Sequence, residues 1–374
     1  MTKKNKKVLT FFLLALTFLG GWFFNKIGGK LLDRIIGEPV EAIIEYASNT
    51  MGKYLKNPLK ELQGKAQNGD LEAQCSLGNM YYFGGQGVVY DYEKAIEWYH
   101  KAAEQGHAKA QYNLAFMYYH GQGVKQDKEE AVKWWRKAAE QGYVSAQYNL
   151  GFMYNNGNGV KQDYKEALKW YHKAAAEQYD ASAQYNLGLM YYHGEGVKQD
   201  KKEAVKWWLV AAEQGHTGSQ YNLGVLYETG DGIKQDYKEA LKWYRIAAEQ
   251  GYAGAQNNLA VMYEKGSGVI QDYEKAIELY TKAAEQGHAN AQYNLGEIYY
   301  EGNGVKRNYS KALWWWRKAA DQSQSQAQYK LGFMYDNGYQ VPKNHNMAMI
   351  LYRKAAKQGH AKAQEILKKR GFTF

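Results

Sequence analysis

The histidines and the single cysteine are the residues best suited to catalysis or metal binding, and their spacing argues against both. Four of the nine histidines follow a glycine at one place in a repeated sequence: His107, His216, His288 and His360. The chain contains no HExxH motif, and Cys75 has no second cysteine with which to form a disulfide or a thiolate metal cluster. The recurring GxGV follows an expected helix and not a strand, so it indicates a helix end and not a phosphate loop. We therefore expect no catalytic residue, no metal site and no cofactor.

The net charge of +10 does not by itself indicate a nucleic-acid partner. Residues 1–72 carry 11 Lys/Arg against 7 Asp/Glu, and we expect the rest of the excess to be spread over helix faces on which Lys and Glu alternate. Such faces are typical of a solvated surface. We expect no nucleic-acid binding.

The N-terminal residues 1–25 resemble a membrane-targeting segment. Four lysines at positions 3, 4, 6 and 7 precede an apolar run from Val8 to Phe24, which is typical of a secretory signal peptide or an uncleaved signal anchor. The run is short for a membrane span, and Trp22 suits an interfacial position. We favour an anchor that leaves the following residues on the periplasmic side, and a cleaved signal with a secreted product is the alternative. Residues 26–65 follow as an amphipathic helical connector, with Ile43, Ile44 and Met51 at helical spacing, which caps the rest.

A unit of about 36 residues fills residues 66–374. AQYNL or a near variant recurs in every unit, giving eight units and a ninth opening helix that serves as a C-terminal cap. In one unit, Gly121 and Gly123 end a first helix, Asp127 caps a second, and Gly142 ends it. A lone hairpin of this size leaves its apolar face uncovered, so neighbouring hairpins must stack into an all-α solenoid.

The repeated residues resemble the Sel1-like repeat, a relative of the tetratricopeptide repeat. The family pattern is legible at Ala146, Leu150, Gly151, Tyr154, Gly157, Gly159, Val160, Asp163, Ala167, Trp170, Ala174 and Ala175. The resemblance covers about 300 of the 374 residues. It implies a right-handed α-superhelix and a scaffold or adaptor role, in a family that includes membrane-associated assembly factors and bacterial proteins that engage host partners.

Aromatic and amide side chains recur on the first helices, off the core face, and suggest a groove for an extended peptide. Tyr offers rigid contact area, and Asn both donates and accepts hydrogen bonds. The alternative is that these residues serve packing between repeats. The predicted inner-groove residues are Tyr112, Asn113, Phe116, Tyr148, Asn149, Phe152, Tyr185, Asn186, Tyr221, Asn222, Tyr293 and Asn294.

Apolar residues replace charged ones at the outer positions of four second helices. Three consecutive tryptophans (WWW) occupy residues 314–316. Trp315 and Trp316 occupy core positions, whereas Trp314 takes a position held by Lys or Glu in the earlier repeats, as does Ile350 in the next unit. Val210 and Ile246 likewise replace lysines. We expect two outer contact patches, Trp314 with Ile350 and Val210 with Ile246, unless neighbouring chain covers them or the changes are neutral.

These features together predict a membrane-anchored scaffold that binds protein or peptide partners in the cell envelope. A secreted effector that binds a foreign host protein is one alternative. A cell-wall glycan-binding protein is another, because stacked tyrosines also suit sugar rings.

Overall fold

The computed structural model describes residues 59–84, 88–178 and 180–373. The predicted segment 1–25 and nearly all of the connector 26–65 lie outside the described residues. Within the described ranges, no helix is long and apolar enough to cross a membrane.

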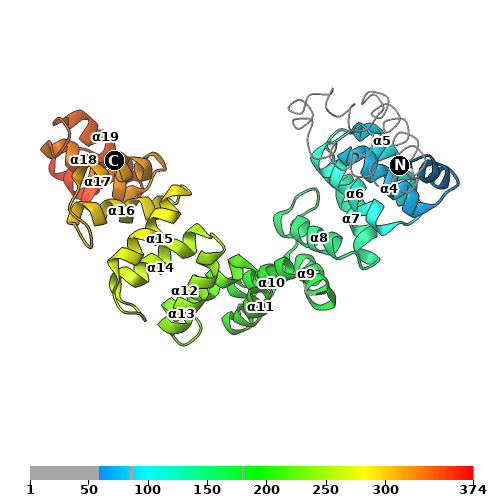
Figure 1. Cartoon of the computed structure of the whole chain (residues 1–374), viewed down its shortest axis with the longest axis horizontal. Helices are drawn as coiled ribbons and strands as arrows, with labels where there is room; N and C mark the ends of the chain where they lie inside the picture. The colour runs from blue at the N-terminus through cyan, green and yellow to red at the C-terminus, as the bar shows by residue number, and fades with distance from the viewer. Residues whose placement is uncertain (1–58, 85–87, 179, 374) are drawn as a thin grey trace, which may run out of the picture. The chain divides into compact units, whose positions relative to one another are not determined.

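Within each of two compact units, consecutive helices pack against one another and form hairpins (Figure 1). Residues 59–67 are helical, and helices of the repeats follow. Unit 1 ends at Gln162 and contains α4 (Leu71–Phe83), α5 (Tyr92–Glu104), α6 (Ala108–His120), α7 (Lys128–Glu140) and α8 (Val144–Asn156). Unit 2 spans Asp163–Phe374 and contains α9 (Tyr164–Gln178), α10 (Ala181–His193), α11 (Lys201–Glu213), α12 (Thr217–Thr229), α13 (Tyr237–Glu249), α14 (Ala253–Lys265), α15 (Tyr273–Glu285), α16 (Ala289–Glu301), α17 (Tyr309–Asp321), α18 (Ser325–Asn337), α19 (His345–Lys357) and α20 (Ala361–Lys369). Even-numbered helices are the first helices of the repeats. The all-helical solenoid is confirmed, while its right-handed superhelix stays a prediction.

The turns follow the chemistry expected from the sequence. Gly121 ends α6 in the left-handed conformation, with φ of 69°. Asp127 then caps α7, its Oδ1 accepting a hydrogen bond from the backbone N–H of Glu130 at 2.9 Å. Both groups satisfy helix-end atoms that have no partner within the helix.

The recurring histidines are helix caps. The Nδ1 atom of His107 accepts from the backbone N–H of Ala110 at 3.2 Å, and His288 does the same for Ala291 at 3.2 Å. Asp180 takes this role at the start of α10, where its Oδ1 accepts from Ala183 at 2.7 Å. These two histidines therefore serve local structure.

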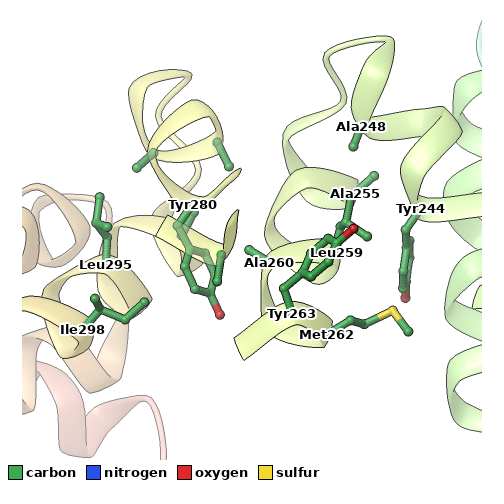
Figure 2. Packing of buried hydrophobic residues seen from close by; sticks show 14 of the residues in the cluster. Tyr244, Ala248, Ala255, Leu259, Ala260, Met262, Tyr263, Tyr280, Leu295 and Ile298 are labelled. Carbon is green, nitrogen blue, oxygen red and sulfur yellow. The ribbon is translucent and has the colours of Figure 1, made fainter. Parts of the chain in front are cut away.

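Within unit 2, the core continues from one hairpin to the next. Figure 2 shows Leu259, Met262 and Tyr263 of α14 between Tyr244 of α13 and Tyr280 of α15. This cluster also includes residues of α16 and α17. Each hairpin thus completes the core of its neighbour, as stacking repeats require.

A ladder of buried glutamines links the repeats within each unit, and the sequence analysis did not find it. Gln111 donates from Nε2 to the Ala103 carbonyl at 3.0 Å and accepts from Nε2 of Gln141 at 2.7 Å. The signal was present, because the second residue of AQYNL is Gln in every repeat. The donor–acceptor pairs are Gln105–Gln74 and Gln141–Gln111 in unit 1, and Gln214–Gln184, Gln250–Gln220, Gln286–Gln256, Gln322–Gln292 and Gln358–Gln328 in unit 2.

Candidate partner-binding surfaces

The first-helix surface of unit 1 contains two adjacent clefts. The first cleft lies between α4 and α6 and has a volume of about 240 Å³. The second lies between α6 and α8 and has a volume of about 220 Å³. Phe116 lines both clefts, so they are consecutive along the surface. The linings are Asn79, Tyr82, Phe83, Tyr99, Tyr112, Asn113 and Phe116 in the first, and Phe116, Tyr119, His120, Trp135, Tyr148, Asn149, Phe152 and Met153 in the second.

The structure brings together all the inner-groove residues predicted in unit 1. Tyr112, Asn113 and Phe116 line the first cleft, and Tyr148, Asn149 and Phe152 line the second. Neither lining includes Asp, Glu, Lys or Arg. Rings and amides without formal charge therefore face any molecule that enters.

Phe83 is a cleft-lining residue that sequence reasoning missed. It lies at the end of α4 beside the first cleft and is 76% exposed. Its ring centroid lies 4.7 Å from that of Tyr82 in an edge-to-face contact. The corresponding position is polar in the following repeats (His120, Asn156, His193, Thr229, Lys265, Glu301 and Asn337). The apolar residue at this position in the first repeat was the sequence signal that could have indicated Phe83.

The amides on this surface also hold neighbouring repeats together. Oδ1 of Asn79 accepts from the Tyr99 hydroxyl at 2.7 Å and from Nδ2 of Asn113 at 3.1 Å. Burial raises the pKa of Tyr112, and a hydrogen bond with Asn149 of the next repeat partly offsets the rise. The alternative interpretation of the recurring Tyr and Asn residues was packing between repeats. These contacts show that the residues do have that role.

The inner-groove residues predicted in unit 2 are half-buried and pair with the adjacent repeat. Burial raises the pKa of Tyr185, which is hydrogen-bonded with Asn222, and its ring centroid lies 4.7 Å from that of His216. Nδ2 of Asn294 donates to Oδ1 of Asn257 at 3.1 Å. Tyr185, Asn186, Tyr221, Asn222, Tyr293 and Asn294 all lie on the first helices α10, α12 and α16.

In unit 2, two residues that contact each other both differ from the residue types at the equivalent positions of other repeats. Lys330 of α18 stands where Asn294 stands one repeat earlier, and Glu297 of α16 replaces an apolar residue. Nζ of Lys330 donates to Oε2 of Glu297 at 2.8 Å, and burial raises the pKa of Glu297. Neither Lys330 nor Glu297 was predicted from the sequence as a site residue.

The two outer patches differ in the structure. Trp314 is 49% exposed and Ile350 is 46% exposed, on α17 and α19, while Trp315 and Trp316 are buried. Val210 is exposed, but Ile246 is half-buried and packs against the cluster that contains Trp208 and Trp243. Neighbouring chain therefore covers part of Ile246, and Val210 is the more exposed member of the predicted Val210–Ile246 patch.

The cysteine and the potential metal ligands of the described residues show no site at which they would react or bind a metal ion together. Cys75 is buried, and burial raises the pKa of its thiol to about 11, which disfavours the nucleophilic thiolate. Across the described ranges, no three His, Cys, Asp or Glu side chains are arranged to hold a metal ion.

Comparison with known proteins identifies the repeat. The Sel1 repeat pattern matches eight consecutive segments, residues 71–107, 108–143, 144–179, 181–216, 217–252, 253–288, 289–324 and 325–360. The chain belongs to the Sel1 repeat family. Sel1 repeat solenoids are typical protein–protein interaction scaffolds, and such proteins are generally not enzymes.

Two solved Sel1 repeat structures are similar to this chain. A protective antigen present in uropathogenic Escherichia coli, which displays an SLR fold, is 42% identical with a TM-score of 0.75. The match covers 83% of this chain and 66% of that one, so this chain spans about two thirds of its length. A Sel1 repeat protein from Oxalobacter formigenes is 34% identical with a TM-score of 0.66, covering 83% of this chain and 89% of that one. Among curated proteins, none matches this chain.

Proposed function

We propose that this Sel1 repeat protein is a membrane-anchored scaffold of the cell envelope that holds an extended segment of a partner protein on the first-helix surface of unit 1. The observation that carries the proposal is the pair of uncharged clefts that share Phe116. Two consecutive clefts suit two side chains of one extended segment.

The lining determines which side chains fit. Phe83, Phe116 and Phe152 offer apolar contact area, and burying one apolar side chain against such a surface contributes about 1.5–3 kcal/mol. A charged side chain would lose water there without finding an opposite charge. The favoured partner segment therefore carries apolar or aromatic side chains at the clefts.

The cellular location rests on the sequence and on one relative. The lysines and apolar run of residues 1–25 support an anchor, with the repeats on the periplasmic side. The similar E. coli protein is described as a protective antigen, which supports a place outside the cytoplasm. Intact-mass measurement of the mature protein separates an anchored chain, which keeps residues 1–25, from a secreted one.

Site-specific photo-crosslinking in the native membrane tests the site. A photoreactive phenylalanine analogue at Phe152 should crosslink to a protein, and the same analogue at Ile270, which is exposed in a loop of unit 2, should not. F83E and F152E should abolish retention of the crosslinked protein, because each puts a charge on the lining of a cleft. Crosslinks to cell-wall glycan would contradict the proposal. So would F83E and F152E variants that retain as much of the crosslinked protein as the wild type does.

A further inference from the structure

The excess positive charge of the chain is concentrated near its C-terminal end. Residues 302–374 hold 14 Lys/Arg and 3 Asp/Glu, whereas residues 73–301 hold 23 Lys/Arg and 28 Asp/Glu. The expectation that the excess is spread evenly over the helix faces is therefore wrong. The last two second helices, α17 and α19, lie in this basic region.

In α7, α9, α11, α13 and α15, one outer lysine pairs with a glutamate of the same helix. Nζ of Lys206 lies 2.7 Å from Oε2 of Glu203 in α11, and Nζ of Lys282 lies 2.6 Å from Oε1 of Glu278 in α15. Similar pairs occur within α7, α9 and α13 (Lys133–Glu130, Lys169–Glu166 and Lys242–Glu239). Lys101 and Lys137, at the position of Lys318 and Lys354, are exposed and form no salt bridge among the described residues. A paired lysine has less to gain from a carboxylate on another molecule.

This pairing is lost in α17 and α19, where apolar residues appear instead. Trp314 and Ile350 occupy the position of Glu278 in these two helices. Met347, one turn before Ile350, is also exposed. Within the described chain, Lys318, Lys354 and Lys357 are exposed and form no salt bridge.

The exposed residues of each helix form one stripe. Residues at intervals of three and four lie on one face of a helix. The basic-apolar face, as we call the two stripes, consists of Lys311, Trp314, Lys318 and Asp321 on α17, and Met347, Ile350, Lys354 and Lys357 on α19. Asp321 is the one carboxylate among these residues.

The aromatic anchor of this face is held in place. The ring centroid of Trp314 lies 4.3 Å from that of Trp315 in an edge-to-face contact, and Nζ of Lys318 lies 3.9 Å from the Trp314 ring centroid. A fixed ammonium beside an exposed indole presents a charge and an apolar surface in one place. Trp is also among the residues that dominate binding energy at protein interfaces.

We infer that the basic-apolar face binds an acidic segment of a partner protein that carries apolar side chains. Carboxylates of the partner would pair with Lys318, Lys354 and Lys357, and its apolar side chains would cover Trp314, Met347 and Ile350. Charge complementarity favours this occupant, because Asp321 is the one carboxylate of the face and no lysine of the face pairs with it. The inference rests on the proposed scaffold function but uses a surface of unit 2, separate from the clefts of unit 1.

Selection of random dodecapeptides displayed on phage, against the full chain, tests the inference. We expect enriched peptides that combine Asp or Glu with Leu, Ile, Phe or Met, and their binding should weaken as salt rises. K318E/K354E should weaken binding of a synthetic enriched peptide by on the order of tenfold or more. W314A/I350A should also weaken it, with the charges intact, because the apolar contacts are lost.

The control places the same charge change at the same helix position elsewhere. K137E/K173E alters lysines equivalent to Lys318 and Lys354 and should leave peptide binding unchanged. F152E should also leave it unchanged, so failure at this face is distinguishable from failure of the clefts in unit 1. Neutral or basic enriched peptides, or equal losses in K137E/K173E, would overturn the inference.

Other occupants give different results. Vesicles of equimolar phosphatidylcholine and phosphatidylglycerol, oligothymidylate, and the purified chain itself are the probes for a lipid surface, a nucleic acid and a second copy. The inference would be overturned if the chain bound one of these probes and not the acidic peptides, and if K318E/K354E abolished that binding. The face would then be assigned to that occupant.

Discussion

The indole of Trp316 in α17 lies against Gly296 in α16, with no room for a side chain between them. A β-carbon at position 296 would lie less than 3.0 Å from Cδ1 and Nε1 of Trp316. The indole also donates from Nε1 to the Tyr293 carbonyl at 3.2 Å, which holds the ring in this position. The two helices of one repeat therefore approach each other through a glycine and a fixed ring.

We expect G296A to destabilise unit 2 by about 1–2 kcal/mol, because a well-packed site tolerates an added methyl group poorly. The cost stays at the low end because Ala115 and Ala260 hold the equivalent position in two other repeats, so the hairpin can adapt. Urea unfolding followed by circular dichroism measures the change. G64A is the matched control, since no atom lies within 4 Å of a β-carbon there, and it should not destabilise the chain. Equal stability of G296A and the wild type would show that the contact is not restrictive.

The glutamine ladder gives a second prediction. Gln292 donates to the Ala284 carbonyl at 3.0 Å and accepts from Gln322 at 2.8 Å. Q292L removes the side-chain donor to the Ala284 carbonyl, which still accepts from the backbone N–H of Gly287 at 3.0 Å, and should lower the free energy of unfolding by about 1–1.5 kcal/mol. Q322A removes only the exposed partner and should cost less than about 1 kcal/mol. Urea midpoints compare the two, and a larger loss in Q322A would contradict the ladder as a source of stability.

The repeat was predictable from the sequence because its determinants are local. Glycines after each helix, the Asp cap at Asp127 and the spacing of core residues are properties of short segments, and the structure contains the hairpins they indicate. The division of WWW into a buried pair and an exposed Trp314 also followed from spacing alone.

The remaining features depend on contacts between repeats, which one repeat does not reveal. Ile246 was expected to be exposed because it replaces a lysine, yet it is half-buried because it packs against the Trp208–Trp243 cluster. Gln111 was not recognised as buried, because a polar residue in a helix usually faces solvent. In the sequence, Phe83, Lys330 and Glu297 are distinguished only by their difference from the residues at the equivalent positions of other repeats.

The histidine caps predict a pH dependence of stability. Burial lowers the pKa of His216, His288 and His360 below the ordinary value of 6.5, so the folded chain favours their neutral forms. This stability is complete above pH 6.5 and decreases as the pH falls through 6.5 towards the folded pKa values, because the unfolded chain then binds more protons. The urea midpoint should therefore be lower at mildly acidic pH than at neutral pH.

Substitution of one cap separates this effect from general acid destabilisation. H288A should lower the free energy of unfolding by about 1 kcal/mol at neutral pH. The loss should be smaller in mild acid, because the wild-type cap is itself weakened there. H288N keeps a side-chain acceptor and should remain close to the wild type at neutral pH while showing less dependence on pH. An identical pH dependence in the wild type and H288N would exclude a contribution from this histidine.

The Lys330–Glu297 pair should show strong coupling between two substitutions. Each side chain is about one quarter exposed (25% for Lys330 and 27% for Glu297), so K330M leaves a largely buried carboxylate without its cation. We expect K330M to lower the free energy of unfolding by about 1–3 kcal/mol. E297V/K330N installs the residue types of Val261 and Asn294 from the preceding repeats and should lie within about 1 kcal/mol of the wild type, because no charge remains buried. A double-mutant cycle of E297V, K330N and E297V/K330N, measured by urea unfolding, gives the coupling, and additive losses would show that the two side chains do not depend on each other.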